Sequence, residues 1–455
     1  MHAFFFFSKN FFFCRPLMSI DPESKLDDTL SSRVSKVSTV SEPVTPPQGP
    51  YWQMVYYAVS GFFFWSLLMV QIPFIDNYFG GTRVIFYITF CYGLASNLIR
   101  VFLIWFYAKS KHSTARRLAD LINYGSILTG LTMAAFPITM VILGTDYPET
   151  GFWICITLTC CMGFFNSLLM NAGFALMSLA PEKSATFFLL GQTTTSVIAW
   201  PLIIALRYAV RALGGGDSTD FIVALSTLTF AAIFCCGAIP LYHFKTKRHP
   251  VFAHILLSGQ STTSLPHASE QPAEAPKSML QVFRIILVPV MCGWGSCIIS
   301  FCVFPGQVGL WFPSWINGPY DYPLYRSFLI YSYAVADTIG RSIPRWSSRL
   351  RNIENKPFVL GTLSRAVIFI PLFLMSSMKL WFVFAADWFR LGLIFFFGVT
   401  NGINFNLSNM LAPRLVETHD KMNVGTLLAF GAINGMFLGA LISLGLVQIP
   451  TDLWN

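Results

Sequence analysis

Two residues of opposite charge lie four positions apart within an apolar stretch of the chain, YAVADTIGRSIPR at residues 333–345. If this stretch is helical, Asp337 and Arg341 share one face of the helix and can form an ion pair. An ionisable group at membrane depth costs at least about 2.5 kcal/mol and faces a bundle interior or an aqueous cavity. Two interpretations stay open: a structural latch at the end of a span, and direct contact with a substrate. They are compatible, because a latch across a transport pathway also gates it.

Further polar side chains interrupt the apolar segments that follow. Arg365 lies near the middle of one of them, and the segment VTNGINFNLSNMLAP carries four asparagines at positions 401, 404, 406 and 409. Amide groups both donate and accept hydrogen bonds, so they can join neighbouring helices or bind a neutral polar ligand. A helix with this many amides does not face lipid on every side. We therefore expect this segment to line an aqueous cavity. Most of the individual amides are expected to form hydrogen bonds between helices.

The composition identifies the elements that must position these groups. Of the 455 residues, 54% are hydrophobic and only 11% are charged, and the mean hydropathy is +0.58. Such a chain is a multi-pass membrane protein. A helix needs about 20 apolar residues to cross the hydrocarbon core, because each backbone group must be satisfied inside its own helix. Eleven such runs are predicted, at 54–75, 84–107, 121–143, 152–176, 185–208, 221–243, 282–304, 324–344, 357–376, 388–410 and 424–447.

Polar segments divide these spans into two sets. The sequence therefore predicts an all-α polytopic membrane protein with about eleven transmembrane helices in a six-plus-five arrangement. The segments rich in Ser, Pro and charge have no hydrophobic periodicity and are expected to be disordered. The predicted organisation is a cytosolic N-terminal tail at 1–50, a six-helix bundle at 51–245, a cytosolic linker at 246–280 and a five-helix bundle at 281–455.

The excess of basic residues sets the expected orientation. The chain has 30 Lys and Arg against 21 Asp and Glu, and basic loops stay on the cytosolic side of a membrane. The basic connections then place the N-terminus in the cytosol and the C-terminus outside the cell. We interpret the positive charge as a topology signal and expect the lipid bilayer as a partner, with no nucleic acid. The plasma membrane is the default location, because no organelle address is found.

Signatures of enzymes and metal sites are not found in the sequence. It contains no phosphate-binding loop, no nucleophile elbow and no zinc-protease motif, and its ten cysteines have no spacing typical of a metal site. We therefore expect no catalytic residue, no metal and no cofactor.

Five short motifs, taken in order, resemble those of the equilibrative nucleoside transporters. They are GQ at 191–192, FP at 304–305, DTIGR at 337–341, RAVIFIPLF at 365–373 and TNGI at 400–403. The resemblance extends over most of the predicted membrane region. It implies a fold similar to the major facilitator superfamily and a facilitative carrier for nucleosides or nucleobases. In such a carrier two bundles rock about a central site, driven by the substrate gradient alone.

Some positions depart from the family pattern. Met69 and Val70 stand where Trp and Asn are expected, and Trp65 lies one helical turn earlier. Asn171 aligns with a glutamine that recognises the nucleobase in well-studied members, and Ala334 stands where an asparagine is often found. These departures bear on the range of substrates more than on the fold.

The resemblance also implies roles for the site residues. Asn171 and Gln192 are expected to offer amides to the base or ribose, and Trp65 and Met69 to supply apolar surface. The Asp337/Arg341 pair is expected to bind the ribose or to hold the transport pathway together. Arg365 and Asn401 are expected inside the second bundle, and their roles are left open. The full predicted substrate or pathway set is Trp65, Met69, Asn171, Gln192, Asp337, Arg341, Arg365 and Asn401.

Several alternatives share the same hydropathy pattern. A hexose or monocarboxylate carrier is one, and an anionic substrate would need an intramembrane arginine without a carboxylate partner. A proton-coupled nucleoside transporter is another, with Asp337 as the titrating group. The neighbouring Arg341 favours the ionised form of that carboxylate, so we expect transport without coupling. An integral-membrane enzyme and a membrane scaffold are less well supported. The sequence does not indicate an oligomeric state.

Overall fold

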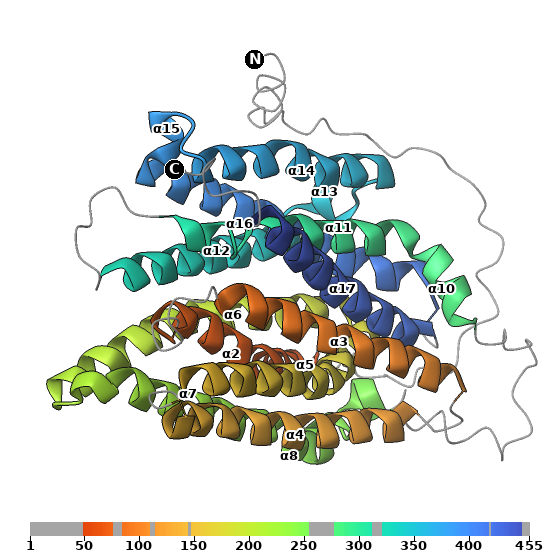
Figure 1. The fold of residues 1–455 in the computed structure, drawn as a ribbon. Helices are drawn as coiled ribbons and strands as arrows, with labels where there is room; N and C mark the ends of the chain where they lie inside the picture. Colours follow the sequence, from red (N-terminus) through yellow and green to blue (C-terminus); the bar gives the residue numbers. More distant parts are fainter. Residues whose placement is uncertain are drawn as a thin grey trace, which may run out of the picture. The chain divides into compact units, whose positions relative to one another are not determined.

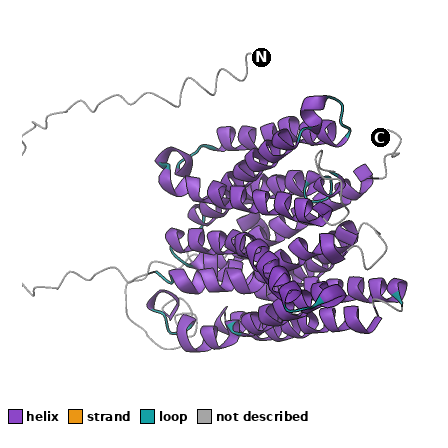
Figure 2. Ribbon diagram, turned by 90° about the vertical axis from the view of Figure 1, so that its left-hand side faces the viewer, coloured by secondary structure: helices purple, strands orange, loops and turns teal. Residues whose placement is uncertain are grey.

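The computed structural model describes residues 49–75, 84–109, 114–143, 147–253, 277–311, 321–417 and 420–447. The predicted cytosolic tail, except for its last two residues, lies outside the described residues. So do most of the predicted linker and the chain beyond residue 447. Helices are the regular elements in the described ranges, which contain no strand (Figure 2). This confirms the predicted all-α class.

The first part of the described chain forms six long helical segments, at the positions of the first six predicted spans. Their outward faces carry large exposed apolar side chains, such as Leu98 and Phe102, which suit contact with lipid. The sixth segment runs on through a short α-helix and a π-helical turn. The bounds are α2 Tyr51–Ile75, α3 Val84–Lys109, α4 Thr114–Leu143, α5 Pro148–Leu179, α6 Glu182–Ala212, η2 Gly216–Ser218, α7 Thr219–Cys236, α8 Ala238–Leu241 and η3 Tyr242–Thr246.

The second part contains five further long segments, the first of which is bent. Its two helices, α10 Met279–Ile285 and α11 Leu287–Val303, meet at 82°. Ser278 and Gln281 form a reciprocal capping box at the start of α10, which satisfies two backbone N–H groups there. The remaining elements are η4 Val308–Leu310, α12 Asp321–Trp346, α13 Ser348–Arg351, α14 Asn355–Ser377, α15 Phe382–Ala385, α16 Asp387–Leu411, η5 Ala412–Leu415 and α17 Lys421–Val447.

The number of membrane-crossing helices differs from the eleven predicted apolar spans. In the described part of the chain, nine helices are long and apolar enough to cross a membrane, or ten if α10 and α11 form one span. The predicted span that does not meet the same test is the eighth, 324–344, which corresponds to α12, a helix of 26 residues. The reason is composition, since α12 carries Arg326, Asp337, Arg341 and Arg345. The exact six-plus-five arrangement stays a prediction.

Close helix packing positions the polar residues of α12. This helix packs along α16 and also contacts α6 and α2, while α17 packs against α11, α5 and α3 (Figure 1). Three glycines allow the approach of α12 and α16: Gly340, Gly398 and Gly402 each face backbone atoms of the other helix. A Cβ atom on Gly398, for example, would lie 2.8 Å from the Tyr333 carbonyl oxygen. The contact therefore depends on small residues, as is common between membrane helices.

Candidate substrate site

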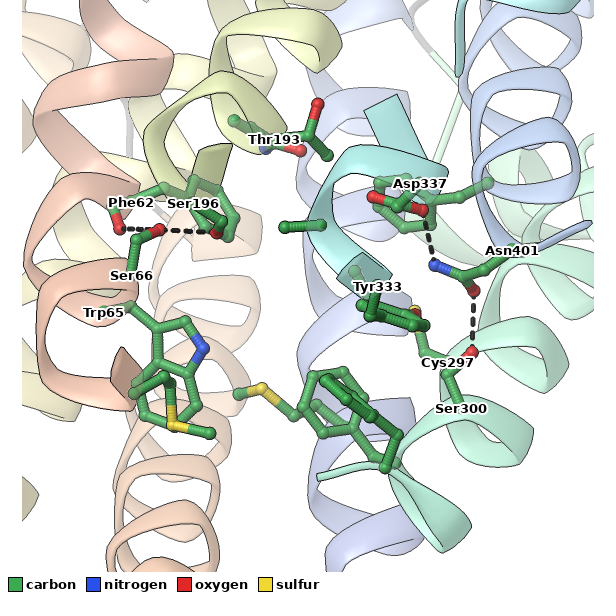
Figure 3. Close-up of a pocket in the computed structure, with 18 of the residues that line it drawn as sticks. Phe62, Trp65, Ser66, Thr193, Ser196, Cys297, Ser300, Tyr333, Asp337 and Asn401 are labelled. Atoms are coloured by element: carbon green, nitrogen blue, oxygen red, sulfur yellow. Dashed lines mark hydrogen bonds between the residues drawn. The ribbon is translucent and has the colours of Figure 1, made fainter. Parts of the chain in front are cut away.

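A cavity of about 180 Å³ lies among eight helices, lined by residues of α2, α3, α5 and α6 and by residues of α11, α12, α16 and α17. Figure 3 shows the two walls, with Ser66 and Trp65 on one side and Asp337 and Asn401 on the other. The walls come from segments far apart in the sequence, so the site exists only when the helices pack together.

The predicted ion pair is formed and buried. The Arg341 Nε donates to Asp337 Oδ2 at 3.0 Å, and both residues line the cavity. The other carboxylate oxygen, Oδ1, accepts a hydrogen bond of 2.8 Å from the Asn401 amide. The guanidinium also lies over the Phe405 ring, 4.7 Å from its centroid. Asp337 is therefore held by two donors, and the charge of Arg341 is compensated within its own helix.

Arg341 also bonds to the opposite wall of the cavity. Its Nη1 donates to the Gln192 side-chain oxygen at 2.8 Å and to the Leu189 carbonyl at 3.1 Å, both on α6. The Gln192 amide nitrogen is buried and has no hydrogen-bond partner among the described residues. One side chain thus joins α12 to α6 next to a cavity, which is the geometry expected of a latch across a pathway.

A second arginine, Arg365, bonds to the hydroxyl groups that orient Asn401. Arg365 donates to the hydroxyls of Ser296 and Ser300 and, through Nε, to Thr400. The two serine hydroxyls in turn donate to the Asn401 side-chain oxygen, at 3.1 and 2.7 Å. Because its oxygen is fixed in this way, the Asn401 amide nitrogen points to the carboxylate. Arg365 is buried but is not among the lining residues, so it acts through these hydroxyls.

Aromatic rings form much of the remaining wall. Trp65 lies against Tyr92 with 4.6 Å between ring centroids, and Phe304 stacks on Tyr333 at 4.1 Å. Met69 adds a flexible apolar side chain on the Trp65 side. Flat apolar surfaces of this kind suit a planar ring in the substrate.

The structure brings six of the eight predicted site residues to the cavity wall. Asn171 and Arg365 are not among the lining residues. Asn171 is 2% exposed and its side-chain oxygen has no hydrogen-bond partner among the described residues. Its α5 neighbours Met170 and Phe174 line the cavity instead. The six that line it are Trp65, Met69, Gln192, Asp337, Arg341 and Asn401.

The other asparagines of α16 act mainly within the protein. Asn404 donates to the Thr362 hydroxyl of α14 at 3.5 Å, and Asn406 donates to the Arg341 carbonyl of α12. Asn409 bonds back to its own helix. These amides link helices, as expected for most of them, and Asn401 is the one among them that lines the cavity.

Several residues that line the cavity were not among the predicted site residues. Arg100 carried a usable signal, because it lies inside the predicted span 84–107, where a charge is costly. Phe304 belongs to the FP motif at 304–305, but the motif alone gave it no place in the site. Tyr92, Ser300 and Tyr333 carried no signal, because aromatic residues make up 16% of this chain and hydroxyl residues are common in its helices. Only helix packing shows that these side chains converge.

Solved structures with the same architecture are membrane carriers. The proton:xylose symporter XylE of the major facilitator superfamily matches with a TM-score of 0.58 at 10% identity, over 89% of this chain and 90% of that one. A bacterial homologue of the iron transporter ferroportin matches with a TM-score of 0.53 at 13% identity, over 89% and 93%. At this identity the likeness shows the fold alone. The described part of the chain therefore has an all-α, major-facilitator-like fold.

Comparison with known sequences identifies the family. The nucleoside transporter family model matches residues 156–448, and the chain belongs to this family. Equilibrative nucleoside transporter 2 from Homo sapiens is 22% identical over 356 residues, which are 70% of this chain and 76% of that protein. The Mus musculus protein of the same name is 25% identical over 359 residues, or 70% and 77%. The chain is therefore a multi-pass membrane transporter and not an enzyme.

Proposed function

We propose that this chain carries nucleosides across a membrane by alternating access, without ion coupling, and that the cavity is the binding site. The proposal is supported by the family match and by relatives whose names describe equilibrative nucleoside transport. The observation that carries it is the bond from Arg341 of α12 to Gln192 of α6, beside Asp337. This bond joins the two cavity walls and must break when they separate.

The lining chemistry fits a neutral polar substrate with an aromatic ring. A ribose offers hydroxyl donors to the Asp337 carboxylate and acceptors to the Arg341 guanidinium. A nucleobase offers amide-like groups to Gln192 and a flat face to Trp65 or Tyr333. The free amide nitrogen of Gln192 supplies a donor for a base carbonyl. The contacts to Asp337 and Arg341 would replace bonds that these residues make within the protein.

The movement follows from the position of this latch. Residues 51–245 and 281–455 would act as two bundles that rock about the cavity.

We further propose a plasma-membrane protein with a cytosolic N-terminus and an extracellular C-terminus, supported by the basic connections between helices. An epitope at the C-terminus, probed with an impermeant antibody on intact cells, tests this orientation. Staining is expected without permeabilisation, and staining only after permeabilisation would refute it.

Uptake into proteoliposomes tests the substrate class. Purified protein is reconstituted, and entry of labelled uridine, adenosine, glucose and lactate is measured beside protein-free vesicles. We expect saturable entry of the two nucleosides, with each competing against the other. Entry of glucose or lactate without nucleoside entry would instead assign a hexose or monocarboxylate carrier.

A further inference from the structure

Arg100 is a buried cation on the cavity wall that the nucleoside scheme does not use. It lies on α3, lines the cavity and is only 1% exposed. Its Nε, Nη1 and Nη2 atoms have no hydrogen-bond partner among the described residues. An arginine offers five N–H donors in a rigid fork. All three of its nitrogens are therefore buried without a partner, on a residue that lines the cavity.

Arg100 differs in this respect from the other two arginines of the site. Arg341 has a carboxylate partner at 3.0 Å, and Arg365 has three hydroxyl partners. Burying a charged group with no partner is strongly unfavourable. An ionisable side chain that is kept at membrane depth usually has a functional partner. The missing partner of Arg100 is expected to enter with the substrate.

The charges of the lining residues do not balance. They include two arginines, Arg100 and Arg341, and one acid, Asp337. Since the acid is paired with Arg341, one positive charge remains. Tyr92 of the same helix also lines the cavity, but it offers no carboxylate, and its hydroxyl accepts a 2.8 Å bond from Asn166. The cavity can therefore take up one negative charge without leaving an unpaired anion.

We propose that Arg100 is a specificity-determining residue that binds a carboxylate on the substrate. The carrier would then accept a nucleoside bearing one carboxylate as well as neutral nucleosides. A guanidinium binds a carboxylate through two parallel N–H···O bonds, which are stronger than bonds between neutral groups. This inference rests on the proposed function, because it assumes that nucleosides bind in this cavity.

Two ligands of nearly equal size isolate the effect of charge. Uridine and uridine 5′-carboxylate are compared as competitors of labelled uridine uptake in proteoliposomes. In the wild type we expect both to compete. In Arg100→Gln the acid should lose potency about tenfold relative to uridine, as expected for a charge-assisted contact. Arg100→Lys should restore part of it. Arg116→Gln removes a positive charge from an exposed position on α4 and should leave both potencies unchanged.

Three results would overturn the inference. One is a wild type whose uridine uptake is indifferent to the acid. Another is an Arg100→Gln protein with unchanged potency of the acid. The third is a variant that loses uridine and the acid equally, which would make Arg100 a contact to a neutral base carbonyl. If no uridine is carried at all, the proposed function fails separately. The acid is then tested by its effect on the melting temperature of the purified protein. Stabilisation of the wild type that Arg100→Gln removes supports the inference, and its absence refutes it.

Discussion

At the residue scale, the site is organised around one carboxylate. Asp337 accepts from Arg341 of its own helix and from Asn401 of α16. Its partners connect onward, through Arg341 to Gln192 and through Asn401 to the serines held by Arg365. A change at Asp337 therefore affects both walls of the cavity at once.

The substitution Asp337→Asn should abolish most transport while the protein still folds. The side chain keeps its shape, but Arg341 loses its counter-ion and one charge-assisted bond, a change of about 1.5–3 kcal/mol or about 10- to 100-fold. Initial uridine uptake is measured and divided by the amount of protein at the cell surface. A pathway role predicts a loss of uptake at nearly normal surface amount.

Arg341→Ala provides the comparison, because it removes the link to α6 as well. If both variants vanish from the surface, the pair acts as a structural latch. If both reach the surface and carry uridine normally, the account of the site is contradicted.

Part of the site could be predicted from residue types, and part could not. Asp337, Arg341 and Asn401 stand out because polar groups are costly in apolar segments. Asn171 was expected in the site from the family resemblance, but on α5 it is Met170 and Phe174 that line the cavity. Which face of α5 meets the cavity depends on helix packing, which residue types do not give.

At the scale of elements, the contact between α12 and α16 positions the ion pair. The two backbones lie so close at this contact that only glycine fits. A Cβ atom on Gly402 would clash with the Asp337 carbonyl oxygen and lie 2.7 Å from the backbone nitrogen of Arg341. The same helix contains a glycine in open space, Gly392.

These two glycines should respond in opposite directions to alanine. Gly402→Ala is expected to destabilise the protein by about 1–3 kcal/mol, as overpacking does, and to lower its melting temperature in detergent. Gly392→Ala is the matched control and should leave the melting temperature equal or higher, because alanine favours the helix. Equal melting temperatures for the two variants would show that α12 and α16 are not packed this closely.

The bond between α6 and α12 should control the speed of the cycle. Gln192→Glu places a carboxylate against Arg341 and converts a bond with a neutral acceptor into an ion pair. The stronger link should slow separation of the walls and lower the maximal uridine transport rate by about tenfold. Gln192→Met cannot accept the bond and should raise KM instead. An unchanged or faster maximal rate in Gln192→Glu would contradict a gating role.

The helices themselves were predictable from apolar runs, but their details were not. Each predicted span corresponds to a helical segment, and most of these segments extend beyond the apolar run at one end or both, since polar helix ends continue the helix. The 82° bend between α10 and α11 left no mark in the hydropathy pattern. The polarity of α12 follows from the same residues that give it a function.

At the scale of the whole molecule, pairings between distant segments create the cavity. The contacts of α17 with α3 and α5 join the end of the chain to its beginning, and Asn97 of α3 donates to the Ile433 carbonyl of α17. Hydropathy gives spans but no partners for them, so these pairings could not be predicted from composition. The family resemblance supplied the expected fold instead, and the family and fold were confirmed by comparison.

Uncoupled transport makes a prediction for the steady state. Both Asp337 carboxylate oxygens accept hydrogen bonds within the protein, from Arg341 and from Asn401, and the proposed cycle uses no proton. With an imposed proton gradient, uridine inside proteoliposomes should rise only to its external concentration. Accumulation above that level, abolished by a protonophore, would instead assign a proton-coupled carrier.

Counterflow is the most direct test of a nucleoside carrier that works through this cavity. Proteoliposomes are loaded with unlabelled uridine, diluted into a trace of labelled uridine, and the internal label is followed over time. The account predicts a transient overshoot of label in uridine-loaded vesicles, none in glucose-loaded vesicles, and none with Asp337→Asn. An overshoot that depends on internal glucose and not on uridine, or one that Asp337→Asn leaves intact, would contradict it.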